Sequence, residues 1–298
     1  MIVVELMGGL GNQLFQYAIG RSLAFKKKTD LFIDTRFLTS RNVTGQRVVF
    51  RNYDLDVFNI NPTLVTLDIS RRYGTSSSFL NRYGKRLLNH WIKTGTLTYV
   101  YERIPFQYDS RIGQVDDNTY LSGYWQSVRY FQSVIKELKS DLCFKKPIPS
   151  FANGLAEDIQ QQQSVCVHVR RSDFVTNLRH NIIETVYYQQ AERMIRTHVT
   201  EPAFYVFSDD IDWCRTHLRF DGPTVFVGDE YAGEQAGTYL HLMTLCHHFI
   251  IPNSTFSWWA AWLSKHADKV VIVPKNWVYD RGTFIKSDEL VYPGWIQL

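Results

Sequence analysis

Short apolar runs alternate with amphipathic segments over residues 165–273, and this alternation constrains the fold more than any other feature of the sequence. Uninterrupted apolar strands separated by helices are typical of a parallel sheet covered on both faces. We therefore predict a doubly wound α/β domain, in which ligands bind at the carboxyl ends of the strands. The expected strands are Val165–Val169, Ala203–Phe207, Thr224–Val227, Phe249–Ile251 and Val270–Val273, and the expected helices are Tyr187–His198, Asp212–Leu218, Ala236–Leu245 and Ser257–Leu263.

The N-terminal half begins with a similar pattern. Ile2–Leu6 fits a strand, Gly8–Gly11 fits a loop, and the apolar residues that follow recur at helical spacing before a second strand at Leu31–Ile33. Residues 41–120 are less regular, with a mostly helical stretch expected over Leu64–Trp91. This half is therefore also predicted to contain a parallel sheet.

A segment rich in lysine and proline separates the two halves. Tyr130–Leu142 fits an amphipathic helix, and Lys145–Ser150 then interrupts all periodicity. We predict domains at 1–148 and 149–298, with the option that the last helix packs back on the first domain.

Composition limits the class of protein. The 298 residues are 45% hydrophobic and carry a net charge of only +4, which fits a folded chain and does not favour a nucleic-acid binder. The 4 cysteines are widely spaced, which indicates free thiols. We see neither an export signal nor an uninterrupted apolar span, so the protein is expected to be cytoplasmic, or at most peripheral to the inner membrane.

His168–Asp173 follows directly on the apolar run Val165–Val167, at the end of an expected strand. The guanidinium of Arg170 matches two phosphate oxygens and stays charged at any working pH, so we predict that it binds an anion. Arg171 with Asp173 fits a salt bridge as well as a ligand contact. By physical argument alone, His168 fits a hydrogen-bonded core histidine.

Two other strand ends carry polar side chains. Asn253–Ser257 supplies an amide and several hydroxyls at an expected helix start, where unpaired backbone amides favour a phosphate. Ser208–Asp212 fits a helix cap, a carboxylate that contacts a nucleoside, or a metal pair formed by Asp210 and Asp212. The metal interpretation is the weakest, because Arg170 and a helix terminus already supply positive potential. The Gly8–Gln13 loop permits close backbone approach to a ligand and matches no standard nucleotide motif.

These segments resemble glycosyltransferase family 11, the α-1,2-fucosyltransferases. His168–Asp173 fits the H-x-R-R-x-D motif of the fucosyltransferase superfamily, and Phe207–Asp210, Asn253–Trp259 and Gly8–Gln13 fit three further motifs in the same order. The resemblance implies a GT-B fold, with two Rossmann-like domains facing each other across a cleft. It implies that the N-terminal domain (1–148) shapes the acceptor site and that the C-terminal domain (149–298) holds GDP-fucose. It implies inverting transfer of fucose from GDP-fucose to the 2-hydroxyl of a galactose-terminated glycan, without a metal or other cofactor. A surface-polysaccharide or O-antigen pathway is the setting suggested by analogy.

The resemblance also implies roles for residues. Arg170 is expected to bind the β-phosphate and act in catalysis, and His168 and Asp209 are expected near the nucleoside. Further binding residues are Gly11, Asn12, Gln13, Arg171, Asp173, Ser208, Asn253, Ser254, Thr255 and Phe256.

Three questions stay open at this stage. Asp34, Glu102, Asp109 and Asp173 are all candidates for a general base, and none is assigned. A metal-dependent glycosyltransferase using Asp210 and Asp212 is one alternative function. A carbohydrate-binding protein without activity, using its 8 Trp and 17 Tyr as stacking surfaces, is another.

Overall fold

The computed structural model describes residues 1–39, 51–65, 91–94, 96–171, 183–233, 236–280, 283–286 and 288–298. The chain divides into two compact units, Met1–Cys143 (unit 1) and Phe144–Leu298 (unit 2). This division comes slightly before the expected boundary after residue 148, directly ahead of the lysine- and proline-containing segment Lys145–Ser150.

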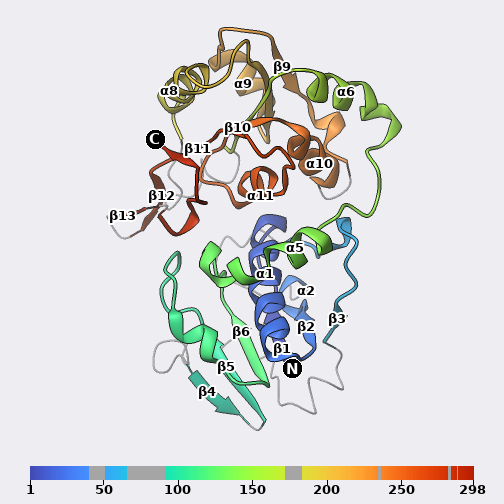
Figure 1. The fold of residues 1–298 in the computed structure, drawn as a ribbon, viewed down its shortest axis with the longest axis vertical. Helices are drawn as coiled ribbons and strands as arrows, with labels where there is room; N and C mark the ends of the chain where they lie inside the picture. Colours follow the sequence, from blue (N-terminus) through green and yellow to red (C-terminus); the bar gives the residue numbers. More distant parts are fainter. Residues whose placement is uncertain are drawn as a thin grey trace. The chain divides into compact units, whose positions relative to one another are not determined.

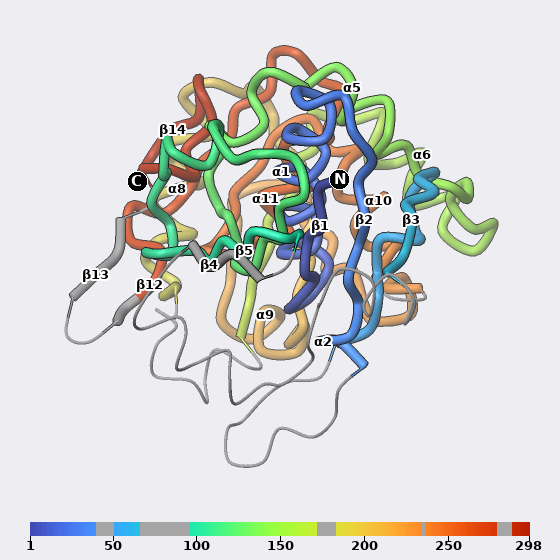
Figure 2. The backbone as a smooth tube through the Cα atoms, turned by 90° about the horizontal axis from the view of Figure 1, so that it is seen from below, coloured from blue at the N-terminus to red at the C-terminus, as the bar shows by residue number. Residues whose placement is uncertain are grey.

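Unit 1 is built on a six-stranded sheet with the order β3-β2-β1-β6-β5-β4. Figure 2 shows β2 and β3 on one side of β1 and β5 and β4 on the other. All neighbours pair in parallel except β4, which pairs antiparallel with β5. The elements are β1 (Ile2–Glu5), α1 (Leu10–Lys27), β2 (Leu31–Asp34), α2 (Arg36–Thr39), β3 (Thr63–Leu64), β4 (Trp91–Thr94), β5 (Leu97–Tyr101), β6 (Thr119–Ser122) and α5 (Ile135–Asp141), with short 3-10 helices at Leu55–Val57, Ser110–Gln114, Val128–Tyr130 and Gln132–Val134.

Helix α1 packs against β1 and β2, as Figure 1 shows. Gly20 permits the close approach, because a Cβ atom there would lie 2.5 Å from Val4 Cγ2 and 2.8 Å from Leu31 Cδ1. The apolar face of the helix is buried at Leu14, Phe15 and Ile19. These contacts hold α1 closely against β1 and β2.

Unit 2 is built on a second six-stranded sheet, with the order β14-β11-β10-β7-β8-β9 and parallel pairing throughout. Strand β7 lies in the middle of the sheet, and every one of its residues is buried. The elements are α6 (Asn153–Gln161), β7 (Ser164–Val169), α8 (Thr185–Arg196), β8 (Ala203–Ser208), α9 (Ile211–His217), β9 (Thr224–Val227), α10 (Gly237–Leu245), β10 (His248–Ile250), α11 (Thr255–Leu263), β11 (Val271–Val273), the hairpin β12 (Asn276–Asp280) and β13 (Thr283–Lys286), and β14 (Ile296–Gln297), with short 3-10 helices at Ser150–Ala152, Asp229–Tyr231 and Asp288–Leu290.

The predicted α/β class is confirmed in both units, and the elements expected between residues 165 and 273 all occur within a few residues of their expected ends. The helix expected over Tyr130–Leu142 is shorter, because two 3-10 turns precede α5. The helical stretch expected over Leu64–Trp91 lies almost entirely outside the described residues, and its two end residues belong to strands. The last element of the chain is strand β14, which pairs with β11 in the unit 2 sheet. A last helix that packs on the first domain was expected from the sequence as an option.

All four cysteines are free thiols, and three of them are buried. Within the described ranges, no helix combines the length and the hydropathy that crossing a bilayer requires.

A Gly20→Ala substitution is expected to destabilise the protein, although alanine favours helix formation. Overpacking against Val4 and Leu31 costs about 1–3 kcal/mol, which outweighs the gain of about 1 kcal/mol in helix propensity. The matched control is Gly154→Ala in α6, where an added Cβ meets nothing within 4 Å. Urea unfolding should show Gly20→Ala less stable and Gly154→Ala at least as stable as the parent chain. Equal stability of the two variants would contradict the packing argument.

Candidate active site

Three polar segments meet at the carboxyl edge of the unit 2 sheet. Strand β7 lies between β10 and β8, and all three run in the same direction. The pairing of Val169 with Ser208 places Arg170 and Asp209 one residue beyond it, on adjacent strands. Asn253–Phe256 follows the end of β10 on the other side of β7. The structure thus brings the described residues of the three motifs to one edge, where parallel α/β sheets bind ligands.

Arg170 is held in place at this edge by Asp209. Its Nη1 atom lies 3.0 Å from Asp209 Oδ2, and the two side chains are 24% and 19% exposed. The other oxygen of Asp209 accepts a 2.8 Å hydrogen bond from the backbone amide of Arg171. Asp209 therefore orients the guanidinium, while the partial exposure of Arg170 leaves it within reach of a ligand.

Arg171 is bound within the protein. Its Nε atom lies 3.3 Å from Asp210 Oδ2, and its guanidinium carbon lies 3.7 Å from the centre of the Trp213 ring. Both contacts fix the start of α9, where Asp210 also accepts a 3.2 Å hydrogen bond from the Trp213 amide. This geometry favours the salt-bridge interpretation for Arg171, with Asp210 as its partner. Asp173 lies outside the described residues.

The carboxylates of the D-x-D alternative are also engaged. Asp210 caps α9 and pairs with Arg171, and Ser208 Oγ accepts a 2.9 Å hydrogen bond from the Asp210 amide. Asp212 is 90% exposed and pairs with Arg215 at 3.0 Å. Their contacts are those of a helix cap and a surface ion pair, and no cluster of three or more potential metal ligands occurs in the described part of the chain.

His168 is a buried, neutral histidine at the same edge. Burial lowers its pKa well below the usual range, and the neighbouring Arg170 acts in the same direction, while Asp209 opposes them. Its Nδ1 atom is buried and has no hydrogen-bond partner among the described residues, and its ring lies 6.0 Å from that of Phe256. A buried polar atom without a partner is costly, so this ring nitrogen is suited to contact a bound ligand.

Helix α11 starts at this edge with an open N-terminus. Ser254 occupies the N-cap position, but its side chain makes no capping hydrogen bond. Asn253 is 5% exposed and donates to the Trp277 carbonyl at 2.6 Å, which fixes the turn before the helix. Thr255 and Phe256 are partly exposed in the first turn, and the tryptophans that follow are buried in the core. The first-turn amides and the helix dipole therefore face a position suited to a phosphate.

The glycine loop of unit 1 is a second open helix start. Gly8 has a φ of 77°, and a Cβ there would lie 2.4 Å from Asn12 Nδ2. Gly9 caps α1 without a side-chain hydrogen bond, and Gly11 is buried within the helix. Asn12 remains partly exposed, and its Oδ1 accepts a 2.7 Å hydrogen bond from Gln126 Nε2. Asn12 is thus positioned by a residue that follows β6.

Gln13 has a structural role in this loop. It is fully buried, donates to the carbonyls of Gly8 and Asn52 at 3.0 and 2.7 Å, and accepts from the Asp54 amide at 2.9 Å. Because its amide group is fully engaged with the backbone, the geometry favours a supporting role over the expected ligand contact.

Two of the four candidate bases are bound within the fold. Burial would raise the pKa of Asp34, but hydrogen bonds from Arg36 and Tyr120 outweigh it and hold the pKa below its usual value. Glu102 is 2% exposed, and its two oxygens accept from the amides of Tyr124 and Trp125 at 2.8 and 2.9 Å. Neither carboxylate is free to take a proton from an acceptor.

Asp109 remains accessible, but hydrogen bonds from Arg111 hold its pKa below the usual value, so it is a weak base. The general base therefore stays unassigned.

Sequence reasoning missed Gln126, Arg51 and the supporting role of Glu102. Gln126 reaches Asn12 across 114 positions of sequence, and the Arg51 guanidinium lies beside Gly9. Both contacts join segments that are distant in the chain. The only local signal was the polar side chain of Gln126 directly after the apolar strand at 119–122.

Comparisons with known proteins give a family model and several relatives. The family model described as Glycosyl transferase family 11 matches residues 1–298. The α-1,2-colitosyltransferase of Escherichia coli is 29% identical over 93% of this chain and 92% of its own length. The O-antigen biosynthesis glycosyltransferase WbnK of Escherichia coli is 29% identical over 98% of this chain and 99% of its own length. Galactoside α-(1,2)-fucosyltransferase 2 of Hylobates lar is 26% identical over 89% of this chain and 69% of its own length.

A solved structure supports the fold. A mutant of Arabidopsis thaliana FUT1 in complex with GDP superposes with a TM-score of 0.52, at 14% sequence identity, over 97% of this chain and 74% of that chain. This similarity confirms the predicted GT-B-like fold with two α/β domains.

Acid should destabilise the folded chain through His168. The unfolded histidine binds a proton below pH of about 6.5, whereas the folded one resists protonation. Its stabilising contribution is therefore complete above that pH and falls by up to about 1.4 kcal/mol per pH unit below it. Urea unfolding between pH 7.5 and 5 should show a smaller loss of stability in His168→Gln than in the parent chain. The exposed His198→Gln variant controls for loss of a histidine, and equal pH slopes in all three proteins would contradict the prediction.

Proposed function

The chain belongs to glycosyl transferase family 11, and we propose that it transfers L-fucose from GDP-fucose to the 2-hydroxyl of a terminal galactose, with inversion and without a metal. The names of its relatives support an α-1,2 linkage, a deoxy sugar and a galactoside acceptor. The observation that carries the proposal is the meeting of Arg170, His168 and the open start of α11 at one sheet edge.

The geometry supports stabilisation of a leaving diphosphate. As the bond between the sugar carbon and the phosphate oxygen lengthens, GDP gains negative charge and the sugar gains positive charge. Arg170 and the first-turn amides of α11 stabilise the developing charge on GDP more than they stabilise the bound donor. The 2-hydroxyl oxygen of galactose bonds to the sugar carbon from the opposite face, GDP leaves with the electron pair of the broken bond, and the hydroxyl proton passes to solvent, since no side chain is assigned as the base. The positive groups are supplied by the protein, which supports the proposal that no metal is needed.

Asp209 and His168 are proposed to serve this site in different ways. Asp209 orients Arg170 through the 3.0 Å contact and ties it to the backbone of Arg171. His168 offers a neutral ring nitrogen to the nucleoside, since its pKa is lowered by burial. Ser254 offers a hydroxyl that no capping bond occupies.

The setting is part of the proposal. The relative WbnK is an O-antigen biosynthesis enzyme, which supports a role in surface-polysaccharide synthesis. Free thiols buried in the core fit a reducing compartment, so we place the enzyme in the cytoplasm or at the inner face of the membrane.

Colitose is a second candidate for the transferred sugar. A colitosyltransferase is among the relatives at 29% identity, and colitose differs from fucose in lacking the 3-hydroxyl. A site that hydrogen-bonds the 3-hydroxyl would reject colitose strongly, whereas a site that makes no contact with this hydroxyl would accept both sugars. Competition between the two donors in one assay decides which sugar the site selects.

The test is GDP release from GDP-fucose with lactose as acceptor, in excess EDTA. We expect turnover by the parent chain and a loss of about 10²–10³-fold in kcat for Arg170→Ala, as for removal of one donor that stabilises a developing anion. Arg215→Ala is the matched control, because Arg215 is 49% exposed and pairs at the surface with Asp212. Turnover that needs added Mn²⁺, or an Arg170→Ala variant with normal kcat, would reject the mechanism.

A further inference from the structure

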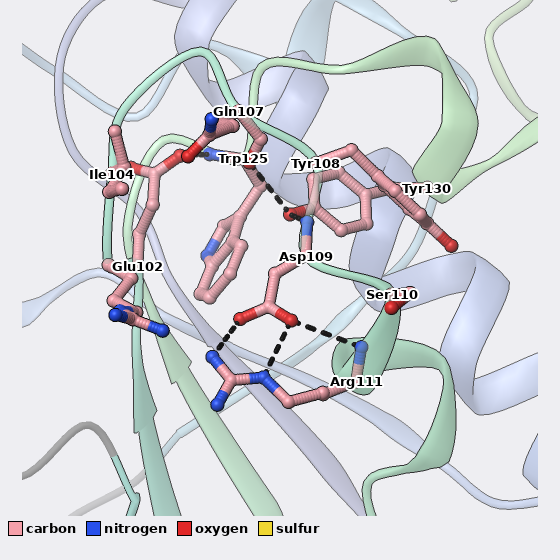
Figure 3. A pocket seen from close by; sticks show the side chains of 10 residues that line it. Glu102, Ile104, Gln107, Tyr108, Asp109, Ser110, Arg111, Trp125 and Tyr130 are labelled. Atoms are coloured by element: carbon pink, nitrogen blue, oxygen red, sulfur yellow. Dashed lines mark hydrogen bonds and ion pairs between the residues drawn. The ribbon is translucent and has the colours of Figure 1, made fainter.

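Unit 1 contains a pocket of about 210 Å³ that no motif in the sequence indicated. It lies at the carboxyl ends of β5 and β6, in the segments that follow these strands. Figure 3 shows its lining side chains, with the Trp125 indole among them. The volume is below the roughly 300 Å³ at which pockets begin to enclose drug-sized ligands, so it fits a single ring. The lining residues are Glu102, Arg103, Ile104, Gln107, Tyr108, Asp109, Ser110, Arg111, Trp125 and Tyr130.

The backbone around the pocket is held in an unfavourable conformation. Trp125 and Phe106 have φ angles of 55° and 59°, in the left-handed region that such residues rarely adopt. Glu102 stabilises the backbone at Trp125, because its oxygens accept hydrogen bonds from the amides of Tyr124 and Trp125 at 2.8 and 2.9 Å. At Gly123, a Cβ would lie 2.3 Å from Glu102 Cβ, so only glycine permits this arrangement. Strain maintained by specific contacts is characteristic of functional sites.

The side chains of the pocket are also fixed in advance. The Tyr130 hydroxyl accepts from the Asp109 amide at 2.9 Å and donates to the Gln107 carbonyl at 3.4 Å. The centre of the Tyr108 ring lies 4.9 Å from that of the Tyr130 ring. The guanidinium carbon of Arg129 lies 4.0 Å from the centre of the Tyr108 ring. A ligand therefore meets a preformed wall and loses little binding energy to ordering it.

The polar groups of the pocket suit a neutral ligand with hydroxyl groups. Asp109 pairs with Arg111 through Nε at 2.8 Å, which places an ionised acceptor beside charged donors. Arg103 and Glu102 add one charge of each sign, so the lining carries no excess charge. Because two guanidinium groups balance the two carboxylates, the lining offers a diphosphate no net positive charge, whereas a sugar hydroxyl can both donate and accept. Aromatic rings beside these groups match the C–H face of a galactose ring, which is apolar because its 4-hydroxyl projects from the other face.

The pocket is connected to the glycine loop. Strand β6 pairs with both β1 and β5, so the segments after all three strands share one edge of the sheet. Gln126, next to Trp125, donates to Asn12 at 2.7 Å. The pocket and the loop expected to contact the donor phosphates therefore belong to one connected structure in unit 1.

We infer that this pocket binds the terminal galactose of the acceptor, with its aromatic wall against the apolar face of the ring and with Asp109 and Arg111 hydrogen-bonding to its hydroxyls. The inference rests on the proposed function for the identity of the sugar. The pocket thus determines which acceptor is bound, and the unit 2 edge binds the donor.

The experiment measures acceptor binding and turnover separately in the full chain. Methyl β-galactoside is titrated in ligand-observed NMR, and lactose KM, kcat and the GDP Kd are determined for the parent, Asp109→Asn and Tyr108→Ala. Loss of a charged hydrogen bond or of the wall should weaken galactoside binding and raise lactose KM about tenfold. The GDP Kd should remain within twofold of the parent value, which a general loss of folding would not allow.

The matched control is Asp141→Asn. Asp141 belongs to unit 1, is 22% exposed like Asp109, and pairs with an arginine, Arg21, at 2.7 Å. Unchanged galactoside binding and KM in both pocket variants, or equal effects in the control, would overturn the inference, as would a parent chain that binds no galactoside. A parent chain that transfers fucose while the pocket variants behave normally leaves the proposed function intact. Galactoside binding that depends on Asp109 and Tyr108 without any transfer supports the pocket and rejects the fucosyl transfer.

Discussion

Parallel pairing of β7 with β8 is the interaction on which the donor site depends. The two strands pair over six residues, from Ser164 opposite Ala203 to Val169 opposite Ser208. This register brings Arg170 beside Asp209, although 38 residues separate the Arg171 amide from the carboxylate that it binds. A shift of one residue would turn each side chain to the other face of the sheet and separate the pair. The buried apolar side chains of β7 and β8 thus hold the charged groups of the edge in place.

Unit 1 uses the same edge of its sheet in a different way. There the positions of the polar groups depend on Glu102, a buried carboxylate whose hydrogen bonds hold the turn at Tyr124 and Trp125. The turn carries Gln126 to Asn12 on one side and places Trp125 in the pocket on the other. Glu102 was a candidate base from the sequence, but in the structure it supports the backbone of this turn. It is buried, and each of its two oxygens accepts a hydrogen bond from a backbone amide.

The charges at the two edges differ, and this difference separates the chemistry proposed for them. At the unit 2 edge, the Arg170 guanidinium, which Asp209 orients, and the helix start of α11 favour a ligand that carries negative charge, and the neutral His168 adds no charge to this edge. In the unit 1 pocket, carboxylates and guanidinium groups balance one another beside aromatic rings, which suits an uncharged sugar. A glycosyltransferase needs both kinds of site, because it binds a diphosphate sugar and a glycan at the same time. Asp210 and Asp212 have other roles than ligand binding in this geometry. Asp210 caps α9 and pairs with Arg171, and Asp212 pairs with Arg215 at the surface.

The sequence by itself determined the α/β class, the strands and helices of residues 165–273, and the three motifs at the strand ends, because periodicity and end signals are local properties of the chain. It also determined the family, since the motifs are short and contiguous. Only the tertiary structure decided that Asp209 contacts Arg170, that Arg171 pairs with Asp210, that the Gln13 amide is bonded to the backbone, and that Glu102, Trp125 and Asp109 line one pocket. Each of these roles depends on contacts between segments far apart in sequence. Such contacts are set by strand order and register, which no local pattern encodes.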